Sequence, residues 1–293
     1  FKNFRNYEID IRDRNKIDSL INDFRPYSLI HTAAQPSHDK AASIPHLDFE
    51  VNAVGTLNLL EAIRNFSKDT IFVHLSTNKV YGDTPNKLKM KELETRWELD
   101  GELFKKGIDE TMSLDNSTHS LFGVSKASSD LLVQEYGRYF DIPTCCLRGG
   151  CLTGPSHSGV ELHGFLNYLI RCNLNKNKYT IFGYKGKQVR DNIHSFDVAN
   201  FISQFIANPK KACIYNIGGG YENSISILES IKKIELISGI KMVFKYDESS
   251  RIGDHICYYT NLNKLREDYP KWKITKNIDA IFEDVYRSLR KNY

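Results

Sequence analysis

The feature that most constrains the fold is an alternation of short buried-type segments with amphipathic ones. Residues 28–34 and 70–75 are rich in β-branched, aromatic and small residues, as strands covered on both faces are. Between them, residues 45–66 carry apolar side chains at helical spacing, and Pro45 suits the first turn of a helix. Strands that alternate with helices predict a parallel sheet with helices on both faces, so we expect an α/β protein.

The alternation continues along the chain. Further helices are expected at 13–24, 120–140, 162–173, 198–207, 225–237 and 278–290, and further strands at 7–11, 143–147, 179–182 and 212–217. Residues 83–118 are charged and lack a clear period, so we expect an excursion or a lid there. No linker rich in Pro, Gly or Ser divides the chain, and its two halves are expected to interlock.

Composition excludes several classes of protein. No apolar run approaches the length of a membrane span, and no secretory signal opens the sequence, so we expect no membrane partner and a cytoplasmic protein. Six scattered cysteines without a C-x-x-C pair indicate reduced thiols, and neither disulfides nor a metal site. A net charge of +4 is too weak for nucleic acid but suits a small anionic substrate.

Two runs carry the chemistry, STNKVYGD at 76–83 and HSLFGVSK at 119–126. They resemble the extended short-chain dehydrogenases, which act with a Ser or Thr at a strand end and a Tyr-x-x-x-Lys pair on the next long helix. Thr77 and Lys126 stand at these positions, but Phe122 stands where the Tyr belongs. A phenyl ring cannot give or take a proton, so the usual acid–base group is missing.

Within that superfamily the chain is similar to the NAD-dependent epimerases and dehydratases of nucleotide sugars, and most similar to the CDP-paratose 2-epimerase family. The supporting runs are DIRD at 10–13, HTAAQ at 31–35, FEVNAVGTLNLLEAIR at 49–64, ELETRWE at 92–98, GIDE at 107–110, GKQVRDNIH at 186–194 and YNIGGG at 215–220. In the family, about 50 residues of strand, helix and strand come before this point and carry the glycine-rich turn for the cofactor pyrophosphate. We therefore expect the sequence to be a piece without that turn.

The resemblance implies a Rossmann-type domain over residues 1–154 and a smaller substrate domain over 155–293, with 191–217 returning to the first. It implies NAD as the cofactor, with Lys126 holding the nicotinamide ribose. The other implied cofactor residues are Asp10 and Ile11 at the adenine, and Ala33, Ala34, Gln35 and Asn52 near the end of the strand at 28–34. Asp10 could alternatively cap the following helix.

The resemblance also implies a nucleotide-diphosphate sugar as the substrate. Phe182 would lie against the base, and Arg190 and Arg251 would grip the diphosphate, a task that suits the guanidinium fork. Structural alternatives stay open: Phe182 could be core, and Arg190 could pair with Asp191 or Asp197.

The residues after Thr77 discriminate between reactions. Related 4,6-dehydratases use Thr-Asp-Glu there, whereas this chain has Thr77-Asn78-Lys79, which disfavours elimination of water. The chemistry that remains is epimerisation by transient oxidation. The resemblance implies that it occurs at C2 of a CDP-dideoxyhexose, in the synthesis of surface-polysaccharide precursors. Candidates for the missing acid–base group are Lys79, His119, or Thr77 acting with a water.

Two other functions stay open, and so does the assembly. The chain could be another epimerase or a keto-sugar reductase, or a silent nucleotide-sugar-binding protein, which Phe122 favours. We expect a homodimer through the helices at 45–66 and 120–140, with Leu131 and Val133 buried only on assembly.

Overall fold

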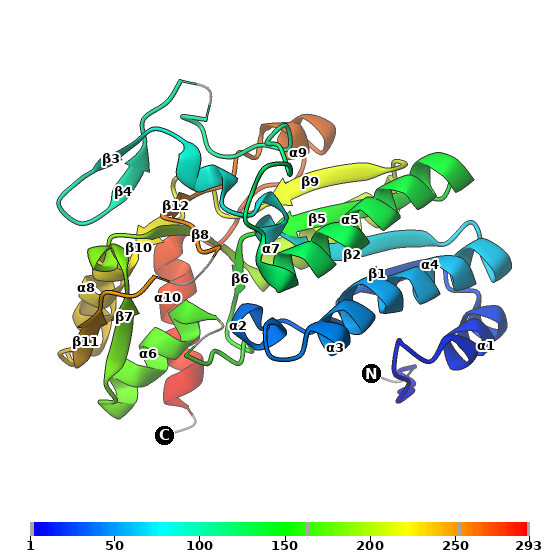
Figure 1. Cartoon of the computed structure of the whole chain (residues 1–293). Helices are drawn as coiled ribbons and strands as arrows, with labels where there is room; N and C mark the ends of the chain where they lie inside the picture. The colour runs from blue at the N-terminus through cyan, green and yellow to red at the C-terminus, as the bar shows by residue number, and fades with distance from the viewer. Residues whose placement is uncertain (1–2, 103, 162–163, 251–252, 292–293) are drawn as a thin grey trace.

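A four-stranded parallel sheet forms the right-hand half of the molecule in Figure 1. The structure is a computed structural model that describes residues 3–102, 104–161, 164–250 and 253–291. The sheet has the order β1-β2-β5-β9, and its strands are β1 (Ser28–His31), β2 (Ile71–Thr77), β5 (Thr144–Gly149) and β9 (Cys213–Ile217).

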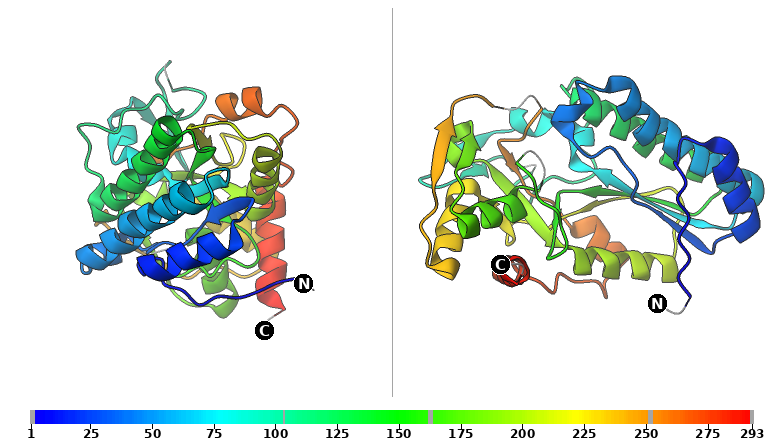
Figure 2. Two further views of the ribbon diagram at one scale, coloured as in Figure 1. Left: turned by 90° about the vertical axis from the view of Figure 1, so that its right-hand side faces the viewer. Right: turned by 90° about the horizontal axis from the view of Figure 1, so that it is seen from below.

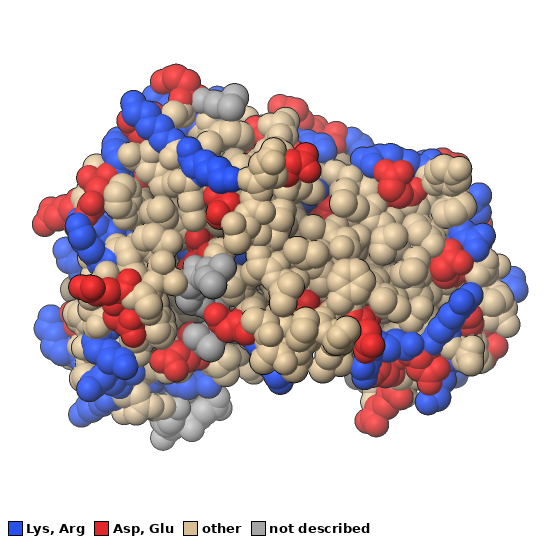
Figure 3. All heavy atoms as spheres, viewed as in Figure 1, with Lys and Arg blue, Asp and Glu red and all other residues tan. Residues whose placement is uncertain are grey.

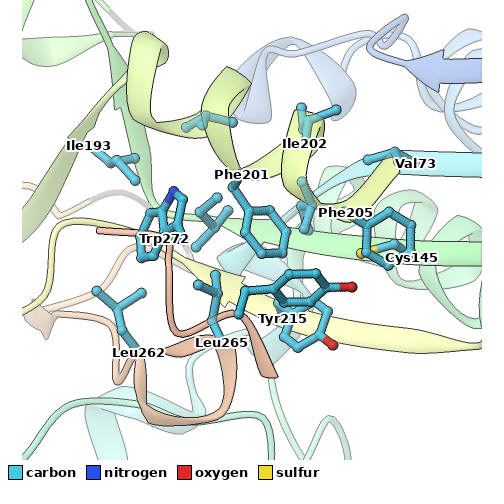
Figure 4. Packing of buried hydrophobic residues seen from close by; sticks show 14 of the residues in the cluster. Val73, Cys145, Ile193, Phe201, Ile202, Phe205, Tyr215, Leu262, Leu265 and Trp272 are labelled. Atoms are coloured by element: carbon cyan, nitrogen blue, oxygen red, sulfur yellow. The ribbon is translucent and has the colours of Figure 1, made fainter. Parts of the chain in front are cut away.

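Helices cover both faces of this sheet, which confirms the expected α/β fold (Figure 2). One face carries α1 (Arg14–Phe24), α4 (Gly55–Phe66) and α5 (Ser120–Phe140), and the other carries α7 (Ser195–Ala207) and α9 (Asn263–Asp268). Figure 4 shows Phe201 and Phe205 of α7 packed against Tyr215 of β9 and Trp272. Burying such aromatic side chains is a main source of stability.

The other half is built around a second, mixed sheet. Its order is β10-β8-β12, with β6 paired to β8, and its strands are β6 (Cys151–Thr153), β8 (Val189–His194), β10 (Ser224–Ser226) and β12 (Cys257–Tyr258). Helices α6 (Phe165–Asn175), α8 (Ile227–Ser238) and α10 (Ile278–Arg290) pack together beside it. Two small two-stranded sheets complete this half, β7 (Tyr179–Phe182) with β11 (Phe244–Asp247) and β3 (Met90–Glu92) with β4 (Trp97–Leu99).

Local sequence sets several helix ends. Ser226 and Glu229 form a capping box at the start of α8, and Gly239 ends that helix with φ +70°. Asn277 caps α10 by accepting a hydrogen bond from the backbone N–H of Ala280. Asp141 ends α5 in the left-handed conformation.

Some expected elements differ in the structure. Residues 7–11 form no strand, because no described strand lies beside them to complete a hydrogen-bonded ladder. The expected helix at 45–66 is interrupted: α3 (Pro45–Phe49) passes through a π-helical segment, η1 (Glu50–Val54), into α4. The start of the helix expected from 162 lies outside the described residues. Residues 83–118 form an excursion that packs on the second half, where Trp97 N–H donates to Lys187 O at 3.0 Å.

The chain crosses between the halves more than once. Strand β8 belongs to the second sheet, whereas α7 packs on the first sheet and β9 belongs to it. The domain limits at 1–154 and 155–293 stay a prediction. Val133 was wrongly expected to be buried only on assembly, because it already lies in the core between α5 and the sheet. Among the described helices, none has the length and apolar character needed to cross a membrane.

Candidate active site

The end of β2 presents Thr77 at the junction of the two halves. Thr77 has extended backbone, and its Oγ1 accepts a hydrogen bond from the Lys79 N–H at 3.2 Å, which caps a short 3-10 helix, η2 (Asn78–Tyr81). This is the carboxyl end of a parallel strand, the edge where open α/β sheets bind ligands.

Helix α5 brings Phe122 and Lys126 beside that strand end. The Lys126 ammonium donates to the Leu75 carbonyl oxygen at 2.8 Å, two residues before Thr77. Burial, opposed by the negative charge of Asp130, lowers the pKa of Lys126 to about 8. Phe122 is 8% exposed, and its ring faces the same cavity as Thr77.

A buried carboxylate ties the expected cofactor loop to α5. Asp48, on α3, accepts from Gln35 Nε2 at 2.7 Å, from Asn52 Nδ2 at 3.2 Å and from Ser125 Oγ at 2.5 Å. Asn52 Oδ1 also accepts from the Gln35 backbone N–H at 2.9 Å. Gln35 and Asn52 are thus brought together, and Asn52 lies in the π-helical segment, a feature often found at functional sites.

The remaining expected cofactor residues lie at the outer part of the first sheet. Ala34 is half-buried and Ala33 exposed just after β1. Asp10 pairs with Arg12 at 2.6 Å and does not cap α1, because Asp13 does so. Ile11 packs closely on Gly55, where an added Cβ would come within 2.5 Å of its Cδ1. Asp10 and Ile11 do not line the cavity that lies between the two halves of the molecule.

A cavity of about 500 Å³ lies between the two halves. It is lined by Pro36, His38, Thr77, Asn78, Lys79, Phe122, Gly150, Cys151, Leu152, Thr153, His157, Glu161, Gly164, Phe165, Leu166, Tyr179, Thr180, Ile181, Phe182, Gln188, Arg190, Asn192, Ile227 and Asp254. Its size and its mixture of apolar walls with a few polar groups are typical of a small-molecule site.

Two cations share one carboxylate in the cavity wall. Asp254 Oδ1 lies 2.9 Å from Lys79 Nζ and 2.8 Å from an Arg190 Nη2. Lys79 also donates to the Gly253 carbonyl oxygen at 3.0 Å. Arg190 therefore pairs with Asp254 and with neither Asp191 nor Asp197, and the three described residues of this cluster carry two positive charges and one negative charge.

The other predicted site residues are distributed unevenly. Phe182, at the end of β7, lines the cavity, whereas Arg251 lies outside the described residues. His119 is directed elsewhere: its Nε2 lies 2.7 Å from the Leu114 carbonyl oxygen, and it does not line the cavity. This position gives no support to His119 as an acid–base group.

Four residues at the site were missed from the sequence: His38, Asp48, Ser125 and Asp254. Asp254 could have been found, since it follows Arg251 in the RIGD run, and Asp48 stands one helical turn before Asn52. Ser125 stands beside Lys126 in the run already singled out. His38 carries no signal in the sequence, because its relation to Phe122 is purely spatial.

Comparison with known proteins identifies the family. Residues 2–218 match the NAD dependent epimerase/dehydratase family. The chain belongs to this family. It is 36% identical over 271 residues to the CDP-paratose 2-epimerase of Salmonella typhi, covering 90% of this chain and 78% of that protein. It is 31% identical over 221 residues to a dTDP-glucose 4,6-dehydratase of Salmonella typhimurium, covering 73% of this chain and 57% of that protein.

Solved structures agree on the fold of this epimerase/dehydratase. The UDP-glucose 4-epimerase of Thermus thermophilus in complex with NAD has a TM-score of 0.80 at 22% identity and covers 98% of this chain and 85% of its own. A Tyr-to-Phe variant of the UDP-glucuronic acid 4-epimerase of Bacillus cereus has a TM-score of 0.79 at 24% identity and covers 98% and 82%.

These findings confirm an NAD-dependent epimerase/dehydratase, as expected from the sequence. The residues present fit the nicotinamide end of NAD, because Lys126 is a buried ammonium with one hydrogen bond to Leu75 and further N–H donors beside Thr77. Residues 1–293 contain no G-x-G-x-x-G or G-x-x-G-x-x-G run to hold the pyrophosphate.

Proposed function

We propose that this epimerase/dehydratase acts on a nucleotide-diphosphate sugar and inverts one ring carbon by transient oxidation, with C2 of a CDP-linked dideoxyhexose as the first candidate. The observation that carries the proposal is the single cavity that joins Thr77 and Phe122 of the first half to Phe182 and Arg190 of the second. A single ligand could therefore place its reacting group at Thr77 and its phosphates at Arg190.

The charge of the cavity wall supports a diphosphate. The side chain of Arg190 is 12% exposed and its guanidinium is already bound to a carboxylate, so it is oriented before any ligand arrives. Phe182 offers an apolar face for a nucleotide base. The 36% identical CDP-paratose 2-epimerase is the relative that leads us to name a CDP-linked sugar first.

The polar groups at the strand end favour epimerisation over loss of water. Asn78 is buried and un-ionisable, and Lys79 carries an amine paired with Asp254, so these two residues cannot supply the acid and carboxylate pair that elimination of water needs. When bound, NAD would accept a hydride from the sugar carbon and return it. Thr77 would donate a hydrogen bond to the sugar oxygen, and Lys126 would hold the nicotinamide ribose and favour nearby negative charge.

The outer face of the helices supports a homodimer. In Figure 3 a broad surface without charged residues spans the region where α3, α4 and α5 lie. Exposed apolar side chains on α3, η1 and α5 include Leu47, Phe49, Val54, Leu121, Val124 and Leu131. An apolar patch of this kind usually marks an interface. The six free cysteines support a reducing compartment, and we place the protein in the cytoplasm, in the synthesis of surface-polysaccharide precursors.

Phe122 favours one alternative, a protein that binds a nucleotide sugar without converting it. The phenol that would normally exchange the proton is absent, while the cavity and Arg190 are kept. In that case the cavity would bind CDP, and no reaction of the sugar would follow.

Proton NMR of CDP-paratose incubated with the protein and NAD tests the proposal, with UDP-glucose as a second substrate for C4. We expect inversion at C2 and, in D₂O, no solvent deuterium on carbon, because transient oxidation returns the same hydrogen. Deuterium at the inverted carbon would contradict transient oxidation. Binding of CDP with no conversion of either sugar would favour the alternative.

A further inference from the structure

The proton of the reacting hydroxyl needs an acceptor that the family's usual position does not supply. Phe122 has no ionisable group, Lys79 is an ammonium paired with Asp254 at 2.9 Å, and His119 is directed toward Leu114. Apart from Thr77 acting with a water, the acceptor is therefore another group that lines the cavity with Thr77.

His38 is a titratable residue on this cavity wall. It is the first residue of the short helix α2 (His38–Ala41), and the preceding Ser37 caps that helix by accepting from the Lys40 N–H at 3.2 Å. The imidazole lines the cavity with Thr77 and Phe122, and its ring centroid lies 6.5 Å from that of Phe122 in an edge-on contact of 66°. The side chain is 13% exposed, so it is held in place and faces little bulk solvent.

The other candidates on the wall are less suited to the task. Burial raises the pKa of Cys151 to about 12, so its thiol stays protonated at neutral pH. Asp254 is bound by two cations. His157 and Glu161 belong to the segment before α6 in the second half, whereas His38 contacts the ring that stands in the Tyr position.

We propose that His38 is the acid–base residue that replaces the missing tyrosine in this enzyme. The inference rests on the proposed function. Neutral His38 would take the proton of the sugar hydroxyl and become an imidazolium, while NAD, when bound, would supply the acceptor for the hydride of the same carbon. After reduction of the resulting ketone from its opposite face, the imidazolium would return a proton to the oxygen, so that no oxidant would be consumed.

The charges around His38 suit this exchange. Asp39 Oδ1 lies 3.7 Å from His38 Nδ1, and a carboxylate there stabilises the imidazolium. Among the described residues, Lys79 on η2 lines the same cavity as His38, and Asp254 on the facing loop pairs with Lys79 at 2.9 Å. Phe122 supplies an apolar edge that orients the imidazole without competing for the proton.

The first experiment compares His38→Gln and His38→Ala with wild type on CDP-paratose. We expect kcat to fall at least about 100-fold with CDP affinity unchanged within about two-fold, because general-base catalysis typically contributes 10²–10⁴-fold. Free imidazole should restore part of the rate to His38→Ala and none to His38→Gln, whose amide fills the position. His46→Gln, at an exposed histidine on α3, is the matched control and should behave as wild type. A loss below about five-fold in both His38 variants would overturn the inference.

A readout independent of turnover separates this inference from the proposed function. In protein labelled with ¹³C-histidine, the ring signal that disappears in His38→Gln should move when CDP-paratose is added but not when CDP alone is added. If wild type converts no sugar and this signal still moves, the proposed function fails and His38 lies at the sugar site. If the signal does not respond to the CDP-sugar, the assignment of His38 is wrong.

Discussion

Arg148 and Asp130 form an ion pair with an Arg148 Nη2 2.8 Å from Asp130 Oδ1, and both side chains are buried. Asp130 also accepts from Ser76 Oγ at 2.5 Å, one residue before Thr77. Arg148 lies over the ring of Tyr81 at 5.1 Å from its centroid. The pair thus joins α5, β2, β5 and the short helix after Thr77, and it fixes the strand end against the helix that carries Phe122 and Lys126.

We expect Asp130→Ala to lower the free energy of unfolding by about 3–5 kcal/mol, because it leaves a buried guanidinium without its carboxylate. The double variant Asp130→Ala with Arg148→Met should be less destabilised than Asp130→Ala alone. Urea denaturation measures both. Arg138→Met, at an exposed ion pair with Glu135, should change stability by less than about 1 kcal/mol. Equal losses in the single and double variants would argue against an unpaired charge as the cause.

The buried Lys126 should make stability depend on pH. Its pKa falls from an ordinary value of 10.5 to about 8 in the folded chain, so the unfolded chain binds more protons between these values. Stability attributable to this group therefore rises as pH increases from about 8 to 10.5, by about 3 kcal/mol. Lys126→Met has no amine to titrate. The amount by which its free energy of unfolding exceeds that of wild type should therefore shrink by about 3 kcal/mol between pH 8 and pH 10.5. A difference that stays constant from pH 7 to 10.5 would show that Lys126 is not neutralised in this range.

Arg190→Ala should weaken CDP binding by at least about 30-fold, which corresponds to about 2 kcal/mol. The reason is that Asp254 would lose one of its two cations and repel the diphosphate. Isothermal titration calorimetry measures the change. Arg287→Ala, on the exposed side of α10, is the matched control. Unchanged affinity in Arg190→Ala would remove this residue from the diphosphate site.

Leu131→Glu should convert a homodimer into a monomer, because it places a charge on the exposed apolar face of α5, where Leu131 is 48% exposed. Sedimentation equilibrium at micromolar concentration measures the mass. Leu236→Glu, on the exposed face of α8 in the other half, should leave assembly unchanged. A wild-type protein that sediments as a monomer would remove the proposed interface.

Phe122→Tyr tests the replacement of the usual acid–base group. The new phenol would stand four residues before Lys126 on α5, and the ammonium would lower its pKa. In wild type the change should alter turnover little, since His38 already acts, but in His38→Ala it should restore turnover at least about ten-fold. The comparison is made by NMR of CDP-paratose conversion. No recovery in the double variant, together with an inactive His38→Ala, would mean that the phenol cannot reach the hydroxyl.

Much of the fold could be predicted from the sequence, because a helix or strand that buries one face has apolar residues at a regular spacing. The helices at 120–140 and 278–290 have the expected bounds, and the strands at 70–75 and 143–147 differ from β2 and β5 by one or two residues at each end. Thr77 and Lys126 were recognisable from their neighbours in the chain. The strand expected at 7–11 was wrong, because a strand also requires a partner that its own residues do not reveal.

By itself, the sequence determined the α/β class, the order of the main helices and strands, and the family. The tertiary structure alone brought His38 to Phe122, Asp254 to Lys79, and Asp48 to Ser125. The physical reason is that a helix or strand is specified by the burial of one face along a continuous segment. The identity of the distant side chain that a polar residue contacts leaves no such pattern, whether the residue lies in a helix or a loop, and it is decided only when the sheet and its covering helices have been packed.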